Sequence, residues 1–164
     1  MYRICVVCTG NICRSPMGEF ILRELFEEAG LGDRVHVDSA GTTAWEEGNP
    51  ADPRTLAVLA RNGHEGLGGD HVARVFRSEW LAERDLVLAA DHGHLGTLRR
   101  MARTEDERAK VAMFRSFDQA GLREDQQSMD DPWYGDDRDF DRTYAEVMGA
   151  ARGVVDHVRR ELDV

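Results

Sequence analysis

The sequence predicts a single α/β domain over residues 1–164, with a four-stranded parallel open sheet and helices on both faces. Four short hydrophobic runs are typical of buried strands. Helical segments alternate with these runs, and this alternation predicts a parallel sheet that is covered on both faces. The length suits one domain with a proper core, and no linker divides it. The predicted strands cover residues 2–7, 35–42, 85–90 and 111–114.

Composition narrows the classes of function. Hydrophobic residues make up 41% of the chain and charged residues 32%, as in soluble globular proteins. No run approaches the ~20 apolar residues that cross a bilayer. The net charge of −10 argues against a broad surface for nucleic acid or anionic membranes. All three cysteines lie within the first thirteen residues, which is not a disulfide framework and indicates a reducing compartment. A loop with candidate functional residues begins by residue 8 and leaves no room for a signal peptide, so we expect a cytoplasmic protein.

The most informative stretch is residues 8–15, Cys-Thr-Gly-Asn-Ile-Cys-Arg-Ser, between the first strand and the first helix. The β-branched run before it ends where Cys8 arrives. Ser15 and Pro16 predict an N-cap followed by the first helical residue. The stretch is therefore a tight loop entering a helix, where backbone N–H groups and the helix dipole form an anion site.

Two side chains predict chemistry at this anion site. Amide dipoles and the nearby Arg14 favour the thiolate form of Cys8. Arg14 presents a planar fork that binds two phosphoryl oxygens at once. A thiolate below a phosphate held by amides and a guanidinium is arranged for in-line attack on phosphorus, which would give a phosphocysteine intermediate.

The remaining loop residues are expected to bind the phosphate. Gly10 is suited to positive φ and to close approach of the backbone to a ligand. Asn11 tolerates left-handed geometry, and its amide can hold the shape of the loop. The predicted phosphate-binding residues are Thr9, Gly10, Asn11, Ile12, Cys13 and Ser15.

The string from Cys8 to Pro16 resembles the phosphate-binding loop of the low-molecular-weight protein tyrosine phosphatases. A cysteine and an arginine six residues apart are a weak signal, but the nine-residue string directly after a first strand is specific. The alternative is an inert buried cysteine in an ordinary strand-to-helix turn. The resemblance covers almost the full chain and implies the same α/β architecture.

The next elements follow from local signals. Apolar residues at helical spacing predict a helix over 16–29, and Gly30 is expected to end it. In the strand at 35–42, Ser39 belongs to a run, Asp-Ser-Ala-Gly-Thr, that also resembles the family. The resemblance implies that Ser39 holds the phosphate loop through hydrogen bonds, and a polar strand end is the alternative.

Trp45 precedes a loop rich in Gly, Pro and Asn. It either packs on a neighbouring helix or lines a site, and the resemblance favours a wall of the substrate cleft. Asp52 is expected to cap a helix over 53–61. His71 resembles a histidine with which the family supports the loop, and a surface histidine is the alternative.

His92 and His94 raise the question of a metal site. They are two residues apart, with no cysteine or third histidine nearby, and match no zinc template. We therefore predict no metal and no cofactor. Asp91 is expected to cap the helix that follows. Around them we expect a short helix at 78–83, a helix at 95–103 and a solvated loop or helix end at 103–110.

A second functional segment is residues 130–135, Asp-Asp-Pro-Trp-Tyr-Gly. Its proline and glycine enforce an irregular loop, and the string resembles the general-acid loop of the family. A carboxylic acid in reach of the ester protonates the leaving oxygen, and the resulting carboxylate then deprotonates water. Asp131 is the candidate acid, and Asp130 is the fallback. The aspartates of residues 136–141 suit the N-terminus of a last helix, whose apolar face extends from residue 144 to residue 162.

Aromatic side chains indicate the substrate. A cleft walled by Trp45, Trp133 and Tyr134 would favour a long aromatic phosphoester over phosphoserine. Relatives that hydrolyse phosphoarginine tend to carry threonine where this chain has Ile12, which favours phosphotyrosine. We expect tyrosine-phosphorylated proteins as partners, inorganic phosphate as product and inhibitor, and a monomer that binds neither nucleic acid nor membranes.

Other functions stay open at this point. A protein-arginine phosphatase shares the loop. A thioredoxin-coupled arsenate reductase shares the fold but relays a disulfide through further cysteines, and none follows Cys13. A non-catalytic phosphate sensor or phosphocysteine carrier would need no Asp131. The resemblance also implies that Cys13 forms a reversible disulfide with Cys8, which would protect the nucleophile from over-oxidation.

Overall fold

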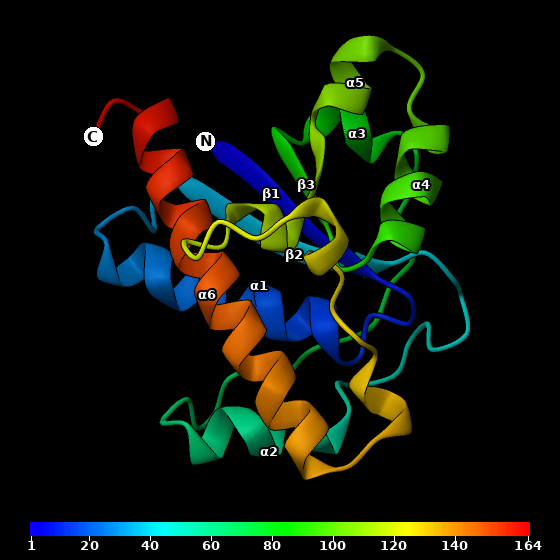
Figure 1. The fold of residues 1–164 in the computed structure, drawn as a ribbon, viewed down its shortest axis with the longest axis vertical. Coiled ribbons are helices and arrows are strands. Elements are labelled where there is room, and N and C mark those ends of the chain that lie inside the picture. Colours follow the sequence, from blue (N-terminus) through cyan, green and yellow to red (C-terminus); the bar gives the residue numbers. More distant parts are fainter.

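Strand β1 (Tyr2–Cys8) lies inside the sheet, between β2 (Val35–Gly41) and β3 (Leu86–Ala89). Strand β4 (Val111–Met113) pairs with β3, and all three pairings are parallel. The strand order of the sheet is β2-β1-β3-β4. The computed structural model describes all residues 1–164, and Figure 1 shows β1, β2 and β3 among the surrounding helices. The predicted fold class is confirmed.

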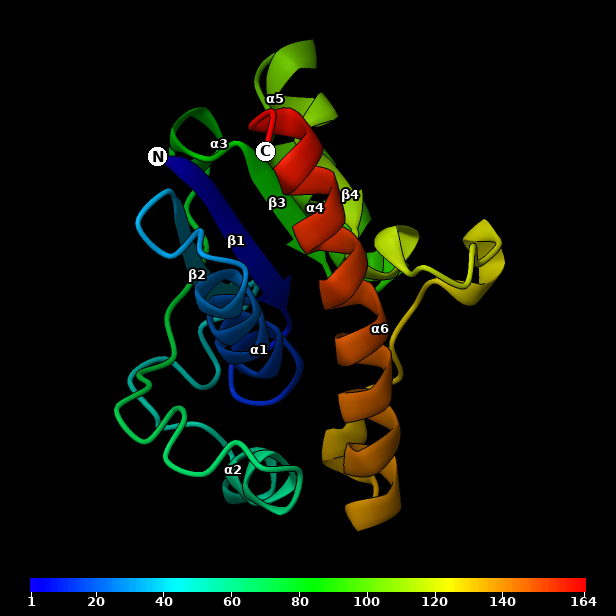
Figure 2. The same ribbon diagram turned by 90° about the vertical axis from the view of Figure 1, so that its left-hand side faces the viewer.

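Helices cover both faces of the sheet (Figure 2). On one face α1 packs beside the long α6, and α2 lies against α6. On the other face α3 and α4 contribute buried leucines to a second core. The helices are α1 (Arg14–Glu28), α2 (Pro53–Arg61), α3 (Trp80–Glu83), α4 (His92–Met101), α5 (Glu105–Ala109) and α6 (Asp137–Glu161). No helix combines the length and apolarity needed to cross a bilayer.

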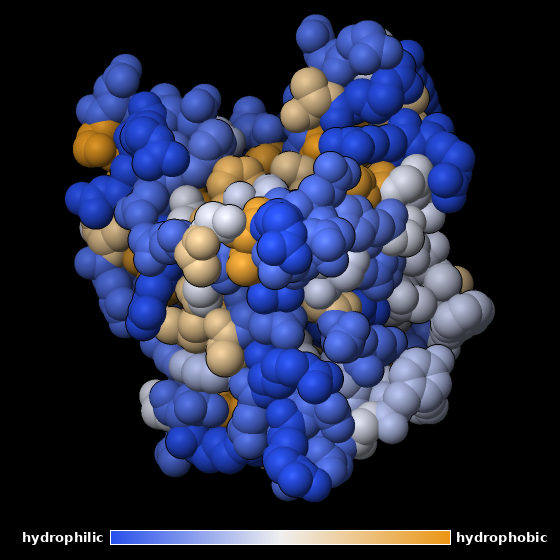
Figure 3. All heavy atoms as spheres, in the orientation of Figure 1, coloured by the Kyte–Doolittle hydropathy of each residue, from blue (hydrophilic) through white to orange (hydrophobic).

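Alternate residues of β1 enter different cores, because successive side chains of a strand point to opposite faces. Ile4, Val6 and Cys8 belong to the core shared with α1 and α6. Cys5 and Val7 belong to the core under α3 and α4. Burial on both faces explains why residues 4–8 of β1 are all hydrophobic. The face in Figure 3, in contrast, is dominated by hydrophilic residues.

Several helix boundaries follow the predicted caps. Gly30, at φ +71, follows the end of α1, and the Asp52 and Asp91 carboxylates accept backbone N–H groups in the first turns of α2 and α4. The N-cap prediction for Ser15 is wrong. Helix α1 begins two residues earlier than predicted, at Arg14 after Cys13, and the Ser15 hydroxyl is engaged with the loop. Proline is tolerated at the third helical residue because its N–H would have no intrahelical partner.

Other boundaries differ by a few residues. Helix α4 begins at His92 rather than at residue 95, directly after its Asp91 cap. The charged segment at 103–110 contains the short α5, whose cap is Thr104. The second strand ends at Gly41.

The strand order places a switch point between β1 and β3. The chain leaves β1 toward β2 on one side and leaves β3 toward β4 on the other. Open α/β sheets bind ligands in the crevice outside the carboxyl ends of such strands. Cys8 ends β1 and Asp91 follows β3, so both lie at this crevice.

Candidate active site

The loop from Cys8 to Arg14 has its carbonyl groups held from outside. The Cys8 carbonyl accepts a hydrogen bond from Thr42 N (2.9 Å), and the Thr9 carbonyl accepts one from Thr43 N (3.1 Å). The Asn11 carbonyl is bonded to His71 Nε2 (2.8 Å), and the Ile12 carbonyl accepts from Asp52 N (2.9 Å). In a trans peptide the following N–H points the opposite way. The N–H groups of residues 9, 10, 12 and 13 therefore face the interior of the loop, where they donate to no group of the protein. This arrangement is an anion site.

Asn11 fixes the shape of this loop. It adopts φ 59° and is completely buried. Its side-chain amide donates to Ser15 Oγ (2.8 Å) and Ser39 Oγ (2.9 Å), while its Oδ1 accepts from Arg74 N (3.0 Å). The expectation that Asn11 takes a left-handed conformation and that its amide bonds within the loop is confirmed.

The expectation of positive φ at Gly10 is wrong, because the neighbouring Asn11 takes that conformation. Gly10 instead leaves room for Glu46. A Cβ at Gly10 would lie 3.1 Å from Glu46 Cγ. At Gly41, which is paired with Cys8, a Cβ would lie 2.6 Å from the Thr9 carbonyl oxygen. The absence of side chains at both glycines lets neighbouring segments pack closely against the loop.

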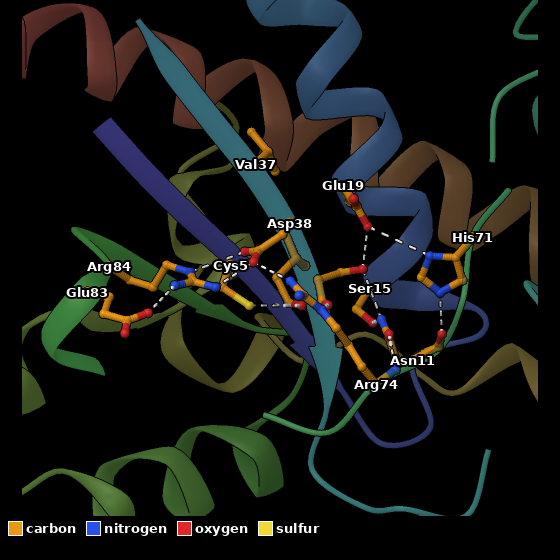
Figure 4. Close-up of polar contacts among 12 residues, drawn as sticks. Cys5, Asn11, Ser15, Glu19, Val37, Asp38, His71, Arg74, Glu83 and Arg84 are labelled. Carbon is orange, nitrogen blue, oxygen red and sulfur yellow. Dashed lines mark hydrogen bonds and ion pairs between the residues drawn. The ribbon is translucent and has the colours of Figure 1, made fainter. Parts of the chain in front are cut away.

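Buried polar side chains behind the loop form a connected network (Figure 4). Ser39 donates to the carboxylate of Glu19 and accepts from Asn11. His71 contacts the Asn11 carbonyl with Nε2, and its Nδ1 lies 3.9 Å from Glu19 Oε2. The His71 side chain is only 6% exposed, so the alternative of a surface histidine is excluded. Ser39 and His71 thus both lie against the loop.

The sulfur of Cys8 lies 3.0 Å from Ser15 Oγ at the end of β1. The Ser15 oxygen already accepts a hydrogen bond from Asn11. Its own proton is therefore free to donate to the sulfur, a bond that an anionic sulfur accepts well. Asn11 and Ser15 thereby connect the loop conformation to the nucleophile candidate.

Arg14 is almost completely buried, and its two terminal nitrogens have different surroundings. Nη1 donates to Asp91 Oδ2 (2.9 Å) and to the Met129 carbonyl (2.8 Å). Nη2 lies 3.6 Å from Asp131 Oδ2. Burial opposes ionisation of Asp91, but its interactions with His94 and Arg14 outweigh burial and lower the pKa of Asp91 below its ordinary value. The guanidinium is therefore held by an ionised carboxylate.

These groups surround one cavity of about 160 Å³. Asp131 lines it and begins a 3₁₀ turn (Pro132–Tyr134), with its Oδ1 accepting from Trp133 N (3.1 Å). The fallback, Asp130, is 82% exposed and lies 4.0 Å from Arg142. Asp131 is therefore the carboxylate at the cavity. The full lining is Cys8, Thr9, Gly10, Ile12, Cys13, Arg14, Trp45, Glu46, Asp131, Trp133 and Tyr134.

Comparison with known proteins agrees with this geometry. The family model described as low molecular weight phosphotyrosine protein phosphatase matches residues 3–164. The chain belongs to this family. A low molecular weight protein-tyrosine-phosphatase from Streptomyces coelicolor is 49% identical over 99% of this chain and 96% of its own length. Low molecular weight protein-tyrosine phosphatase A from Mycobacterium tuberculosis is 41% identical over 95% of this chain and 91% of its own length. The protein is thus a phosphatase, and its family acts on phosphotyrosine proteins.

Solved structures support the same assignment. A protein tyrosine phosphatase from Entamoeba histolytica, with Hepes in its active site, superposes with a TM-score of 0.88 at 25% identity, covering 99% of both chains. Vibrio vulnificus Wzb in complex with benzylphosphonate gives a TM-score of 0.78 at 28% identity, covering 95% of this phosphatase and 98% of Wzb.

Aromatic side chains form the rim of the phosphatase cavity. Trp133 and Tyr134 meet edge to face, with ring centroids 5.0 Å apart. Trp45 is 79% exposed and lines the same cavity, so it does not pack on a neighbouring helix as a core residue. All three predicted wall residues therefore lie at one opening. Asn11, Ser15, Ser39 and His71 lie behind the cavity and do not line it.

Cys13 lines the cavity as a buried free thiol. Burial, followed by the charge of Asp52, raises the pKa of Cys13 well above its ordinary value. Cys8 is likewise not in a disulfide in this structure, and the disulfide between the two cysteines stays a prediction.

Three functional contacts of the phosphatase were missed by sequence reasoning. Asp91 was expected only as a helix cap, yet it also binds Arg14. His94 was considered only as a metal ligand, yet it contacts Thr9. Arg54 donates to the carbonyl groups of Trp133 (3.2 Å) and Gly135 (3.3 Å) in the Asp131 loop. These pairs are 77 to 85 residues apart, and no local pattern reports such contacts.

Proposed function

We propose that this phosphatase hydrolyses phosphotyrosine on proteins in two steps, with Cys8 as nucleophile, Arg14 as phosphate ligand and Asp131 as general acid. In the first step the Cys8 sulfur bonds to phosphorus while the bond from phosphorus to the tyrosine oxygen breaks. Asp131 gives its proton to that departing oxygen. The observation that carries the proposal is the meeting of these three side chains around one cavity.

The second step restores the enzyme. The Asp131 carboxylate takes a proton from water as the water oxygen bonds to phosphorus, and the phosphorus–sulfur bond breaks. Inorganic phosphate leaves, Cys8 is again a thiolate, and Asp131 is again protonated. Loop N–H groups and Arg14 bind the phosphoryl oxygens throughout, a preorganised arrangement that needs no reorientation during the reaction. Phosphate, as the product, is expected to compete with substrate for the same cavity.

The cavity also supports phosphotyrosine as the substrate. Trp45, Trp133 and Tyr134 surround the opening and offer ring faces and edges to an aromatic ester. The related Wzb was solved with benzylphosphonate. Like phosphotyrosine, benzylphosphonate has an aromatic ring joined through one atom to a tetrahedral phosphorus group. Ile12 offers an apolar contact at the cavity, which gives no hydrogen bond to a guanidinium and therefore disfavours phosphoarginine.

The other candidate functions have less support. Arsenate reduction through thioredoxin would need a cysteine after Cys13, and none is present. A phosphate carrier would not need a carboxylate 3.6 Å from the phosphate-binding arginine, where Asp131 lies. Tyrosine-phosphorylated proteins are therefore the expected partners, for a single-domain enzyme that acts as a monomer in the cytoplasm without a cofactor.

The test measures turnover of aryl phosphates with good and poor leaving groups, and of matched phosphotyrosine, phosphoserine and phosphoarginine peptides. Cys8→Ser should lose detectable turnover, while Cys5→Ala, in the opposite core, should retain it. Asp131→Asn should lose about 10²–10⁴-fold on the poor leaving group and less on the good one, the loss expected for a missing general acid. Asp130→Asn is the matched control. Turnover by Cys8→Ser, or equal rates on poor leaving groups for Asp131→Asn and wild type, would overturn the assignment.

A further inference from the structure

His94, in the first turn of α4, reaches across to the phosphate loop. Its Nε2 lies 2.8 Å from Thr9 Oγ1. The imidazole is buried, and Thr9 lines the catalytic cavity. This contact joins the loop after β1 to the helix after β3, at the switch point of the sheet. The effect of this contact on Thr9 depends on whether His94 Nε2 or Thr9 Oγ1 donates the hydrogen bond.

The other ring nitrogen of His94 decides that question. The Asp91 main-chain N–H donates to His94 Nδ1 at 3.2 Å, as part of a capping box. A proton on Nδ1 would face this N–H and leave it without an acceptor, which buried backbone groups rarely tolerate. The carboxylate oxygen Asp91 Oδ1 is also 3.2 Å from Nδ1, but it is already satisfied by the His94 main-chain N–H, whereas the Asp91 N–H has no acceptor other than Nδ1. We therefore assign Nδ1 as acceptor.

The imidazole carries a single proton at neutral pH. Burial lowers the pKa of His94 to about 4; Arg14 adds to this effect, while Asp91 and Asp131 oppose it. With Nδ1 as acceptor, the one proton lies on Nε2. His94 thus donates to the Thr9 oxygen.

Thr9 Oγ1 accepts from two donors, because Arg14 Nη2 also lies within 3.5 Å of it. A hydroxyl oxygen has two acceptor sites and one proton. With both acceptor sites directed at His94 and Arg14, the proton must point elsewhere, and no protein group accepts it. Thr9 lines the cavity, so that proton is available to a group bound there.

We propose that His94 is a positioning residue that orients the Thr9 hydroxyl, so that Thr9 donates a hydrogen bond to an oxygen of the bound phosphoryl group. The inference deepens the proposed function by adding a side-chain donor to the N–H groups and Arg14. A purely structural contact between α4 and the loop would make a different prediction, because it would affect stability without affecting anion affinity.

The test uses inorganic phosphate as the probe, with its dissociation constant measured by titration calorimetry on the intact protein. Thr9→Val keeps the shape and removes the donor. It should weaken phosphate binding about tenfold or more, because it removes a hydrogen bond to a charged group. Thr9→Ser restores the donor and should recover most of the affinity. Thermal unfolding checks that each variant is folded.

His94 is tested through the coupling between the two residues. His94→Phe should weaken phosphate binding in the wild-type background by about threefold or more, and have no further effect in Thr9→Val. His94→Gln retains an N–H donor and should lose less; it replaces His94→Phe if that variant does not fold. The matched control is His92→Gln, two residues away, where the imidazole contacts the Glu124 carbonyl outside the cavity.

Two results would overturn the inference. One is a folded Thr9→Val that binds phosphate as wild type does. The other is additive loss from Thr9→Val and His94→Phe, which would show that the residues act separately. Because phosphate binding is measured without turnover, these results remain distinct from failure of the proposed function, which would appear as wild-type protein that binds phosphate but leaves phosphotyrosine intact.

Discussion

Asp91 Oδ2 lies 2.9 Å from Arg14 Nη1, and this contact joins the N-cap of α4 to the first residue of α1. The Met129 carbonyl accepts from the same nitrogen. Nη1 is therefore engaged by the protein, and Nη2 is the terminal nitrogen on the side of Asp131 and the cavity. An arginine held in this way loses little side-chain entropy when it binds an oxyanion.

The Asp91–Arg14 contact should matter more for catalysis than for stability. Asp91→Asn keeps an oxygen to cap α4 but removes the charge that holds the guanidinium. We expect kcat/KM for an aryl phosphate to fall roughly 10–100-fold, as a misplaced group near the chemistry can cause. Asp91→Ala should in addition lose about 1 kcal/mol of unfolding free energy with the cap. Wild-type kinetics in Asp91→Asn would contradict this role.

Arg54 should position the general-acid loop. Its guanidinium bonds to two carbonyl groups of residues 133 and 135, and Asp52 holds it in place. Arg54→Ala should lower kcat on poor leaving groups about tenfold and affect good leaving groups less, because only the former depend on proton transfer.

Arg61→Ala is the matched control for Arg54→Ala. Arg61 also lies on α2, but it contacts Asp141 of α6, outside the loop. Its loss should change stability slightly and leave the leaving-group dependence unchanged. An equal kinetic effect in both variants would indicate that α2 acts only through its packing.

Asn11 should be essential to the loop for two separable reasons. Asn11→Gly loses the three side-chain hydrogen bonds but can still adopt φ 59° without strain. Asn11→Ala loses the same hydrogen bonds and is strained at that φ. We expect denaturant unfolding to show a loss of about 2–4 kcal/mol for Asn11→Ala and less for Asn11→Gly. Asn49→Ala, at an exposed asparagine, is the control. Equal losses at Gly and Ala would show that backbone conformation contributes nothing.

The low pKa of His94 should appear as a dependence of stability on pH. The native pKa is about 4 against an ordinary value of 6.5, so between these values the unfolded chain binds a proton that the native state does not. Stability from this residue is full above pH 6.5 and is lost as the pH falls to 4. At 1.36 kcal/mol per pKa unit the loss is about 3 kcal/mol. His94→Gln should flatten the unfolding free energy over this range, and an unchanged slope would contradict the shift.

The cysteines should differ in their rates of alkylation. Burial raises the pKa of Cys13 and of Cys5, so both remain thiols near pH 8 and react slowly. Iodoacetate should therefore label Cys8 first, and inorganic phosphate should slow the reaction. Peptide mass spectrometry identifies the site. Labelling of Cys13 at a rate comparable to Cys8 would contradict the prediction.

Sequence reasoning was most successful where the determinants are local. The phosphate loop, the Asp131 segment and the strands each depend on a few consecutive residues. Ser15 shows the limit of local rules, because its hydroxyl is used by Cys8 and Asn11 instead of capping the helix. Asp91 followed its capping rule and also acquired a second role that depends on strand order. Such roles arise only when the sheet brings separate loops together.

The outward carbonyl groups of the phosphate loop have a wider consequence. A peptide unit is rigid, so residues that restrain its oxygen also aim its hydrogen. The shape of the anion site therefore depends on four residues that do not line the cavity: Thr42, Thr43, Asp52 and His71. A related chain could keep the whole signature string and still lose its affinity through changes at these surrounding positions. The activity of such a chain therefore depends on the residues that bond to the loop carbonyl groups as well as on the motif itself.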